Sequence, residues 1–343
     1  MNILILHTQV PFVTGGAEVL VDGLRRELQL RGHAADVVAL PLSWNPPERL
    51  LTSALAWRLL DLRRFNDRVI DRVICTKYPT WAAVHPHKSL WLVHQHRQAY
   101  DLFGTTLSEF TPEKPSQDIR QHVVDIDKLG IGECQPRFAI SRNVAARLET
   151  FSGLRADALY PPVPRAGLQP ERYDPFILSV ARLDASKRVD RIIEAFASVR
   201  SDMQLHIVGD GPDRLPLEAL AVRRGMTERI VFHGRVSDDD LACLYNRCRA
   251  VYYAPVDEDY GYTTIEALTA GKPVITAHDS GGVLEFVTNN VTGLVVSLQP
   301  GDLAAAVDQL ADEAFARMLG ASGPNLTSGL SWDRVIDALL GAA

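Results

Sequence analysis

The stretch that decides the fold is FILSVARLDASKRVDRIIEAF, residues 176–196. Its opening run, Phe176 to Val180, is almost entirely apolar, as in a strand that is buried on both faces. From residue 189 onward the apolar side chains recur at helical spacing. The polar loop between these two segments carries Arg182 and Lys187. A buried strand, a polar loop and an amphipathic helix in this order are typical of a βα unit in a parallel sheet.

The same alternation extends outward in both directions. In the first half it predicts a helix that Gly32 ends, and strands at 2–7, 36–40, 72–75, 90–94 and 138–141. In the second half it predicts strands at 176–180, 205–209, 230–234, 250–254, 273–276 and 294–297, with helices over 189–199, 215–224, 238–248 and 263–270. We therefore expect an α/β protein of two Rossmann-like domains, whose parallel sheets face a deep interdomain cleft.

A proline-rich segment separates the two halves. YPPVP (160–164) and LQPERYDP (168–175) supply prolines without helical or strand periodicity, which indicates a linker. A chain of 343 residues is also too long for one ordinary core. The final segment, LSWDRVIDALLGAA, has the pattern of one amphipathic helix.

Composition excludes some classes of function. Hydrophobic residues make up 46% and charged residues 23% of the chain, as in soluble globular proteins. A net charge of −6 gives no reason to expect a nucleic-acid partner. The four cysteines lack C-x-x-C spacing, which favours reduced core thiols over a zinc site. The apolar run Ile3 to Leu6 is too short for a signal peptide or a membrane span, so we expect a cytoplasmic protein.

Two loops after strands have features that suit an anionic ligand. Gly15 and Gly16 precede a helix, where backbone N–H groups can approach an anion. The pattern is not G-x-G-x-x-G, and no acidic residue ends the second strand, which disfavours a dinucleotide-dependent oxidoreductase. Arg182 and Lys187 stand at the entrance to a helix, where the dipole prefers anions. They are either solvated surface cations or a clamp for a phosphate group.

More glycine-bearing loops follow other strands of the second half. They are VGDGP (208–212), the loop of HGRVSDDDLACLY (233–245) with Ser237 as a helix N-cap, and SGG (280–282). Each is commonplace alone. Together they predict a phosphorylated ligand held by the C-terminal half.

The stretch EDYGYTTIEALTAGKPV (258–274) carries two glutamates, Glu258 and Glu266. They fit the acid and base of a glycosidase. Alternatively, Thr263 and Glu266 form a capping box, with Gly271 ending the helix. In the first half, His94 and His96 follow a strand. They lack a further metal ligand at supporting spacing, so we expect no metal site.

The motifs taken together resemble a known family over almost the whole chain. They are GGAE after the first strand, ISRNVAARL before YPPV, SVARLDASKRVDRIIEAF, VGDGP, FHGRVSDDDLACLY, E-x7-E at Glu258 and Glu266, GKPVITAHDSGGVLEFV followed by TGLVV, and a terminal SW. Their order and spacing resemble retaining glycosyltransferases of the GT-B fold, family 4. The resemblance implies an acceptor-side domain over 1–165 plus about 325–343, and a donor-binding domain over 170–324.

The resemblance also implies roles for particular residues. Arg182 and Lys187 would bind the diphosphate of the donor, Glu258 the transferred sugar, and Glu266 the ribose hydroxyls. His94 would lie near the reactive centre, with His96 as the second choice. Donor contacts are further implied for Gly15, Gly16, Gly209, Arg235, Val236, Gly261, Tyr262, Thr263 and Thr264.

The implied activity is retaining transfer of a sugar from a nucleotide-diphosphate sugar to an acceptor hydroxyl, without a metal ion. UDP or GDP is the expected donor nucleotide. The acceptor would be a sugar, a lipid-linked molecule or a small molecule, in polysaccharide, glycolipid or glycoconjugate biosynthesis. A nucleotide-sugar epimerase and a non-catalytic nucleotide-sugar-binding protein of the same architecture stay open as alternatives.

One segment raises the question of a membrane. Arg49 to Arg72 mixes six arginines with several leucines and a tryptophan. Such a segment is either an amphipathic surface for peripheral contact with the inner face of a membrane, or an ordinary surface helix with internal salt bridges.

Overall fold

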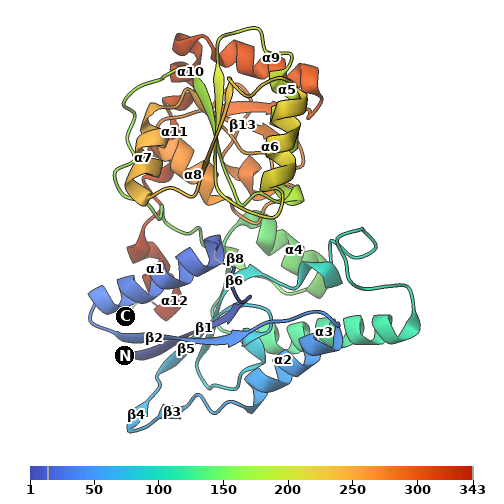
Figure 1. The fold of residues 1–343 in the computed structure, drawn as a ribbon. Coiled ribbons are helices and arrows are strands. Elements are labelled where there is room, and N and C mark those ends of the chain that lie inside the picture. Colours follow the sequence, from blue (N-terminus) through green and yellow to red (C-terminus); the bar gives the residue numbers. More distant parts are fainter. Residues whose placement is uncertain (14, 342–343) are drawn as a thin grey trace. The chain divides into compact units, whose positions relative to one another are not determined.

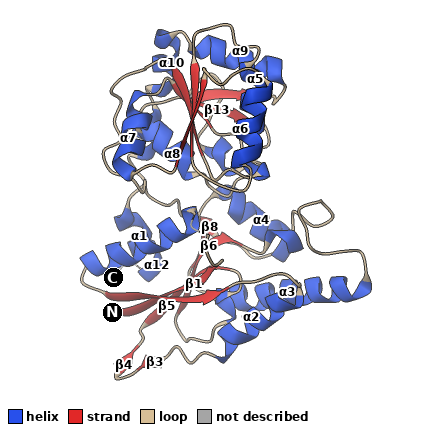
Figure 2. Cartoon of the chain, viewed as in Figure 1, coloured by secondary structure: helices blue, strands red, loops and turns tan. Residues whose placement is uncertain are grey.

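The computed structural model describes residues 1–13 and 15–341, which fold into two compact units. Unit 1 consists of Met1–Pro161 and Ser331–Ala343, and unit 2 of Pro162–Leu330. Each unit is built on a six-stranded parallel sheet with helices packed on its faces (Figure 1, Figure 2). The predicted α/β class, with two Rossmann-like parallel sheets, is confirmed.

The sheet of unit 1 has the strand order β2-β1-β5-β6-β7-β8. Every ladder in it is parallel; Ile3, for example, faces Ala35 on one neighbour and Arg72 on the other. The central strands are buried almost throughout, because helices cover both faces. The strands are β1 (Asn2–Gln9), β2 (Ala34–Pro41), β5 (Arg72–Lys77), β6 (Lys88–His94), β7 (Arg137–Ala139) and β8 (Asp157–Ala158).

The helices of unit 1 include one from the end of the chain. They are α1 (Gly16–Leu30), α2 (Glu48–Leu59), α3 (Lys114–Gly132), α4 (Arg142–Ser152) and α12 (Trp332–Leu340), with 3₁₀ turns η1 (Thr80–Ala82) and η2 (Arg97–Ala99). Helix α12 buries Val335, Ile336 and Leu339. Its first residue, Trp332, lies against Gly23 of α1, where an added Cβ would come within 2.7 Å of the indole. This close approach requires glycine at position 23.

Two expectations for unit 1 and the cysteines need correction. A single helix over Arg49–Arg72 is wrong, because α2 ends at Leu59 and the chain then forms the hairpin β3 (Arg64–Phe65) and β4 (Arg68–Val69). Asn66 closes that hairpin with φ at 51°, a conformation that asparagine tolerates. The prediction that the cysteines lie in the core is confirmed for three of them but is wrong for Cys243, which is exposed.

The sheet of unit 2 has the strand order β11-β10-β9-β12-β13-β14, and all its ladders are parallel. The strands are β9 (Phe176–Val180), β10 (Gln204–Val208), β11 (Ile230–Gly234), β12 (Ala250–Tyr252), β13 (Val274–Ala277) and β14 (Gly293–Val296). The helices are α5 (Val189–Phe196), α6 (Arg214–Arg223), α7 (Asp238–Arg247), α8 (Tyr262–Thr269), α9 (Pro300–Leu310), α10 (Glu313–Gly320) and α11 (Gly323–Thr327), with 3₁₀ turns η3 (Ala185–Lys187) and η4 (Gly282–Glu285).

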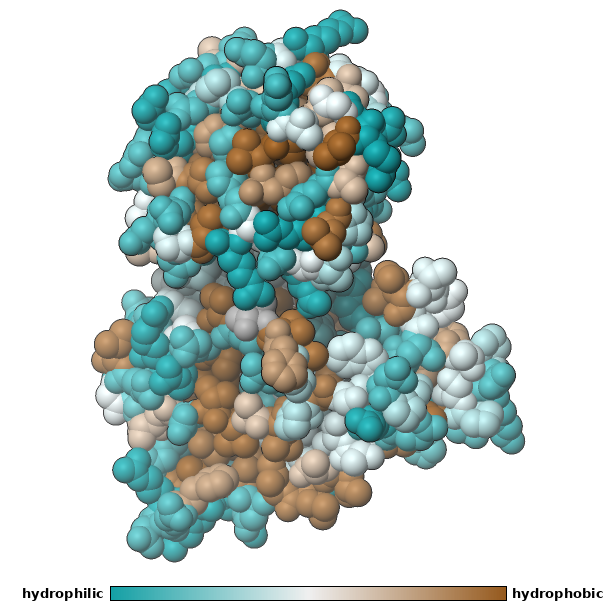
Figure 3. Space-filling view, viewed as in Figure 1, coloured by the Kyte–Doolittle hydropathy of each residue, from teal (hydrophilic) through white to brown (hydrophobic). Residues whose placement is uncertain are grey.

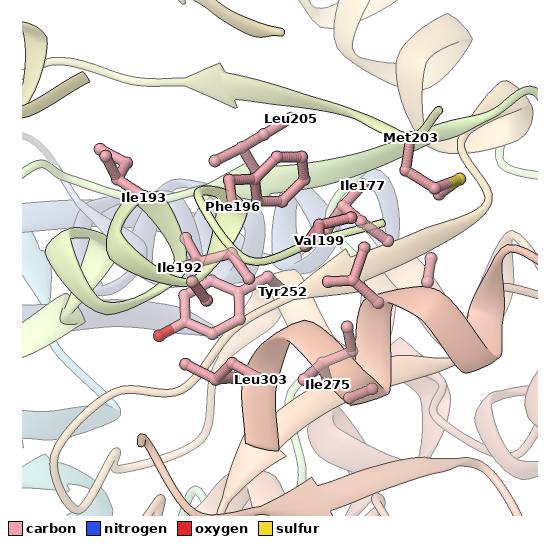
Figure 4. Close-up of a cluster of buried hydrophobic side chains, with 14 of the residues drawn as sticks. Ile177, Ile192, Ile193, Phe196, Val199, Met203, Leu205, Tyr252, Ile275 and Leu303 are labelled. Atoms are coloured by element: carbon pink, nitrogen blue, oxygen red, sulfur yellow. The ribbon is translucent and has the colours of Figure 1, made fainter. Parts of the chain in front are cut away.

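The core of unit 2 lies on both faces of this sheet. Helices α7 and α8 cover one face, and α5 and α6 cover the other (Figure 2). Alternate residues of β9 serve the two faces: Ile177 packs with α5, and Leu178 packs with α8. Figure 4 shows Phe196 and Ile192 of α5 against the sheet residues Leu205 and Tyr252. The stretch quoted first thus anchors the whole unit, since its strand is central and its helix fills one core.

Candidate functional site

Two loops of unit 2 bring a predicted cation and a predicted carboxylate together. Lys187 ends η3 after β9, and Glu258 lies between β12 and α8. The Lys187 ammonium pairs with Oε2 of Glu258, and the Tyr253 hydroxyl donates a hydrogen bond of 2.8 Å to the same oxygen. The two charged side chains are 20% and 17% exposed, so water screens their attraction less than at an open surface. Burial and the charge of Glu258 raise the pKa of Tyr253, which keeps its hydroxyl protonated as a donor.

The second predicted cation lies outside this cluster. Arg182 is half-exposed, and its ion pair among the described residues is with Asp184, at 3.7 Å from Nε to Oδ2. Asp184 also accepts a hydrogen bond of 3.0 Å from the Ser186 N–H and so fixes η3. The structure therefore joins Lys187 to Glu258 and leaves Arg182 at the edge of the same loop.

Glycines let the loop of Glu258 pack tightly at the start of α8. Gly261 has φ at 86°, and a Cβ there would lie 2.9 Å from the Tyr253 ring. Gly282 donates its N–H to the Glu258 carbonyl at 2.7 Å, and a Cβ on it would lie 2.6 Å from the Asp259 carbonyl oxygen. Glu258 is thereby held beside the N-terminus of α8, the positive end of the helix dipole.

Glu266 does not cap a helix, and the capping box with Thr263 is wrong. Helix α8 begins at Tyr262 after Gly261, with no side-chain cap. The Thr263 hydroxyl instead donates to the Val180 carbonyl at 3.0 Å. Glu266 lies one turn further on, 4% exposed, with Oε1 at 3.3 Å from Nε of Arg165. Gly271 does follow the helix with φ at 68°, as expected for the residue after a helix end.

Two hydroxyls near this helix are buried without a hydrogen-bond partner in the described part of the chain. They belong to Tyr245 of α7 and Thr264 of α8. Burial and the charge of Glu266 raise the pKa of Tyr245, so it is neutral at physiological pH.

The remaining predicted residues of unit 2 lie at the ends of β10 and β11. Gly209 has φ at 130°, and a Cβ on it would overlap the Ala181 carbonyl oxygen at 1.8 Å. Its N–H donates to the Gly234 carbonyl at 2.8 Å. Arg235 is exposed and Val236 is half-buried. Ser237 is the N-cap of α7, as predicted, and accepts the Asp240 N–H.

In unit 1 the glycine loop is tied to a buried charge cluster. Gly15 is the N-cap of α1, and its N–H donates to Oε2 of Glu18 at 2.8 Å. Oε1 of Glu18 lies 3.2 Å from both His7 Nε2 and Lys77 Nζ. Burial alone would raise the pKa of Glu18, but the His7 hydrogen bond, the Lys77 charge and the Gly15 N–H lower it to about 2. Glu18 belongs to the GGAE motif but was not among the predicted site residues, although an acid three residues after an N-cap is a signal for a capping role.

The two histidines after β6 have different surroundings. His94 ends the strand, is half-buried, and its Nδ1 lies 2.7 Å from the Gln95 carbonyl oxygen. His96 is 6% exposed, and its Nε2 lies 2.5 Å from Oε1 of Glu109. Within residues 1–13 and 15–341, no three histidine, cysteine, aspartate or glutamate side chains gather closely enough to hold a metal ion.

A fully buried carboxylate supports the loop of these histidines. Asp127 of α3 accepts hydrogen bonds from Trp81 Nε1 at 2.8 Å, Gln95 Nε2 at 3.0 Å and the Tyr100 hydroxyl at 2.7 Å. Burial raises the pKa of Asp127 to about 7, although the three donors oppose that shift. No periodicity or motif marked this residue, because its partners, at positions 81, 95 and 100, are far from it in the sequence.

Part of the chain matches a known family of proteins. Residues 165–324 match the model of the family described as "Glycosyl transferases group 1". This match covers most of unit 2, including Lys187, Glu258 and Glu266.

Individual relatives carry related names. A GDP-mannose-dependent alpha-(1-6)-phosphatidylinositol monomannoside mannosyltransferase of Mycobacterium tuberculosis is 34% identical over 216 residues, 57% of this chain and 56% of that protein. An alpha-D-kanosaminyltransferase of Streptomyces kanamyceticus is 33% identical over 155 residues, 43% of this chain and 40% of that protein. The alignments thus span about half the length of these curated relatives.

Solved structures share the fold over the whole chain. Sucrose-phosphate synthase from Thermosynechococcus elongatus has a TM-score of 0.76 at 19% identity, with both chains fully covered. Anabaena Alr3699/HepE in complex with UDP and glucose has a TM-score of 0.69 at 16% identity, over 98% of this chain and 97% of that one. The fold is therefore the GT-B fold that the sequence motifs predicted.

Proposed function

We propose that this protein is a retaining glycosyltransferase, which moves a sugar from a nucleotide-diphosphate sugar to an acceptor hydroxyl without a metal ion. The observation that supports this function best is the Lys187–Glu258–Tyr253 cluster beside the N-terminus of α8. This cluster combines a cation and a carboxylate with the N-terminus of a helix, within the segment that matches the family model.

Transfer of the sugar requires stabilisation of the diphosphate leaving group. As the bond from the sugar C1 to the phosphate oxygen breaks, negative charge grows on the diphosphate and positive charge grows on the sugar. In this proposal Lys187, Arg182 and the N–H groups at the start of α8 stabilise the diphosphate. The acceptor oxygen attacks C1 from the face that the phosphate leaves, and the phosphate takes the acceptor proton. Retention follows without a protein nucleophile.

The other predicted residues take supporting roles in this proposal. Glu258 accepts hydrogen bonds from sugar hydroxyls and Glu266 from ribose hydroxyls, while His94 of unit 1 serves the reactive centre. Backbone groups near the base, the sugar and the phosphates belong to Gly15, Gly16, Gly209, Arg235, Val236, Gly261, Tyr262, Thr263 and Thr264.

UDP and GDP are the donor nucleotides that we favour. A UDP complex is known for one structural neighbour, and one relative is named as GDP-mannose-dependent. Thermal unfolding in the presence of UDP-, GDP-, ADP- and TDP-sugars tests this choice, because a ligand that binds the folded state raises Tm. Hydrolysis of the stabilising donor is then followed. Conversion of a donor into its epimer would identify an epimerase instead, and binding without any turnover would identify a binding protein.

Acceptors of polysaccharide or glycolipid biosynthesis fit this proposal, and contact with a membrane surface is part of it. No helix in the described residues is long and apolar enough to cross a membrane. However, Leu55 and Leu59 of α2, and Phe65 and Val69 of the β3–β4 hairpin, expose large apolar side chains close to several exposed arginines. Hydrophobic residues reach the surface among hydrophilic ones elsewhere as well (Figure 3).

The membrane contact has a simple test. The protein should sediment with anionic vesicles at low salt, and Leu59→Glu should reduce the bound fraction. Equal sedimentation with anionic and neutral vesicles, or none with either, would remove this part of the proposal.

A further inference from the structure

An arginine that no motif marked holds one of the two predicted carboxylates. Arg165 lies in the segment that leads into β9, and its guanidinium lies between two helices of unit 2. Its Nε is 3.3 Å from Oε1 of Glu266 on α8. Its Nη1 pairs with the Asp238 carboxylate at the start of α7 and lies 3.3 Å from the Asp238 carbonyl oxygen. The Arg165 side chain is 16% exposed and that of Glu266 is 6% exposed, so this contact is largely shielded from water.

The surroundings of Glu266 do not favour an ionised carboxylate by themselves. The groups that face it are Arg165, Asp238 and Tyr245 from neighbouring elements and Tyr262 from its own helix. Burial raises the pKa of Glu266, and the charge of Asp238 adds to the rise. Arg165 is the cation of this group and opposes both effects.

We infer that Arg165 is a positioning residue, which keeps Glu266 ionised and oriented to accept both hydroxyls of a ribose cis-diol. The inference rests on the proposed function, in which Glu266 meets the nucleoside of the donor. An ionised carboxylate has acceptor sites for two O–H donors, and such charge-assisted hydrogen bonds are stronger than neutral ones. The Arg165–Glu266 pair would therefore select ribonucleotides over 2′-deoxyribonucleotides.

A purely structural role for Arg165 makes a different prediction. On that reading, Arg165 pins the segment before β9 to helices α7 and α8, and its loss lowers stability at every pH to a similar degree. On the present inference, its loss changes the charge state of Glu266. Nucleotide affinity then becomes dependent on pH, since raising the pH ionises Glu266 again.

The test measures Kd for UDP, GDP, 2′-deoxy-UDP and 2′-deoxy-GDP by titration calorimetry between pH 7 and pH 9.5. The proteins are the wild type, Arg165→Met, Arg165→Lys, Glu266→Gln and the control Arg247→Met. Arg247 lies on α7, as does Asp238, and its Nη2 is 2.7 Å from Oδ2 of Asp174. It is not one of the groups that face Glu266. Tm is recorded for each protein at each pH, so that binding is compared among folded proteins.

The wild type should prefer its ribonucleotide by about tenfold, the value of one charge-assisted hydrogen bond. Arg165→Met should lose about tenfold in affinity at pH 7 and regain most of it by pH 9.5, whereas Arg165→Lys and Arg247→Met should stay within about threefold of the wild type. Glu266→Gln should be weak at every pH and should not distinguish the sugars.

Two results would overturn the inference. A folded Arg165→Met protein with wild-type affinity at pH 7, or with a loss that does not change with pH, would show that Arg165 does not control Glu266. If the wild type binds none of the four nucleotides, the choice of UDP or GDP as donor nucleotide fails, and this inference fails with it.

Discussion

Lys187 forms the ion pair on which the proposed chemistry depends most. Its ammonium pairs with the Glu258 carboxylate, which links the loop of Lys187 to the loop of Glu258. A diphosphate that arrives at this place would take over the ammonium and release the carboxylate to the sugar hydroxyls. Lys187 would then stabilise the negative charge that grows on the diphosphate during the reaction.

Removing this cation should therefore damage turnover more than binding. Lys187→Met should lower kcat/KM for donor hydrolysis roughly 100- to 1,000-fold, the size of losing one stabilising donor of a developing charge. Arg182→Met should lower it by a smaller factor, because Arg182 is half-exposed. Lys128→Met, at an exposed position of α3, is the matched control. Near-normal turnover in both Lys187→Met and Arg182→Met would exclude the clamp.

Glu18 should make the stability of unit 1 depend on pH. Its pKa is about 2 in the folded state against 4.5 when unperturbed, so its stabilisation is complete above about pH 4.5 and is lost as pH falls toward 2. The shift corresponds to about 3 kcal/mol at pH 7. Glu18→Gln should lower the free energy of unfolding by up to that amount at pH 7, and the difference should shrink below pH 4.

Tryptophan fluorescence in urea measures the free energy of unfolding of unit 1, because all five tryptophans lie in that unit. Asp22→Asn, a change at an exposed acid on the same helix, serves as the control. A difference between Glu18→Gln and wild type that is constant from pH 7 to pH 3 would contradict the account.

For individual residues, the sequence identified the charged side chains of the site but not the residues that they contact. Lys187 was singled out as a cation in a loop after a strand, and Glu258 and Glu266 as a spaced pair of glutamates whose donor roles the family resemblance implied. Their contacts were not predicted. Arg165 reaches Glu266 across about a hundred positions of sequence, and only the packing of three elements brings them together.

At the scale of elements, the start of α8 is the most demanding part of the site. Gly261 combines a positive φ with a close approach to Tyr253. Gly261→Ala should therefore strain the backbone and displace the loop of Glu258, with at least about a tenfold loss of kcat/KM. Gly225→Ala is a matched control, because Gly225 has φ at 67° and nothing within 4 Å of an added Cβ.

Both glycine variants should lose about 1 kcal/mol of stability from the backbone conformation alone. The loss of activity should be specific to Gly261→Ala. Equal kcat/KM for the two variants would show that the geometry of this loop does not matter for function.

The boundaries of elements show where sequence patterns are informative. The predicted strands at 176–180 and 230–234 coincide with β9 and β11. β9 is buried and reads as a short apolar run, whereas β11 is a partly exposed edge strand that begins with three apolar residues. The two-residue strand β8 and the β3–β4 hairpin were missed, because they are too short to show a period. The prediction of a single helix over Arg49–Arg72 was wrong because the apolar residues of this segment belong first to a helix and then to a hairpin.

At the scale of the molecule, unit 1 is completed by the end of the chain. Leu339 of α12 is fully buried in unit 1, and its carbonyl accepts hydrogen bonds from Arg72 and Ser89. Leu339→Ala should destabilise unit 1 by about 2–5 kcal/mol, the range for a buried leucine. Leu129→Ala, at an exposed position of α3, should have little effect. Tryptophan fluorescence in urea distinguishes them, and equal midpoints would show that α12 contributes nothing to the stability of unit 1.

For the whole protein we propose cleavage of a nucleotide-diphosphate sugar with retention, at the Lys187–Glu258 site. The most direct measurement is proton NMR of the purified protein with the donor that stabilises it best, at early times before the released sugar mutarotates. We expect release of the nucleoside diphosphate together with sugar of the donor's own anomeric configuration, and loss of this signal in Lys187→Met. First release of the opposite anomer, or equal release by Lys187→Met, would contradict it.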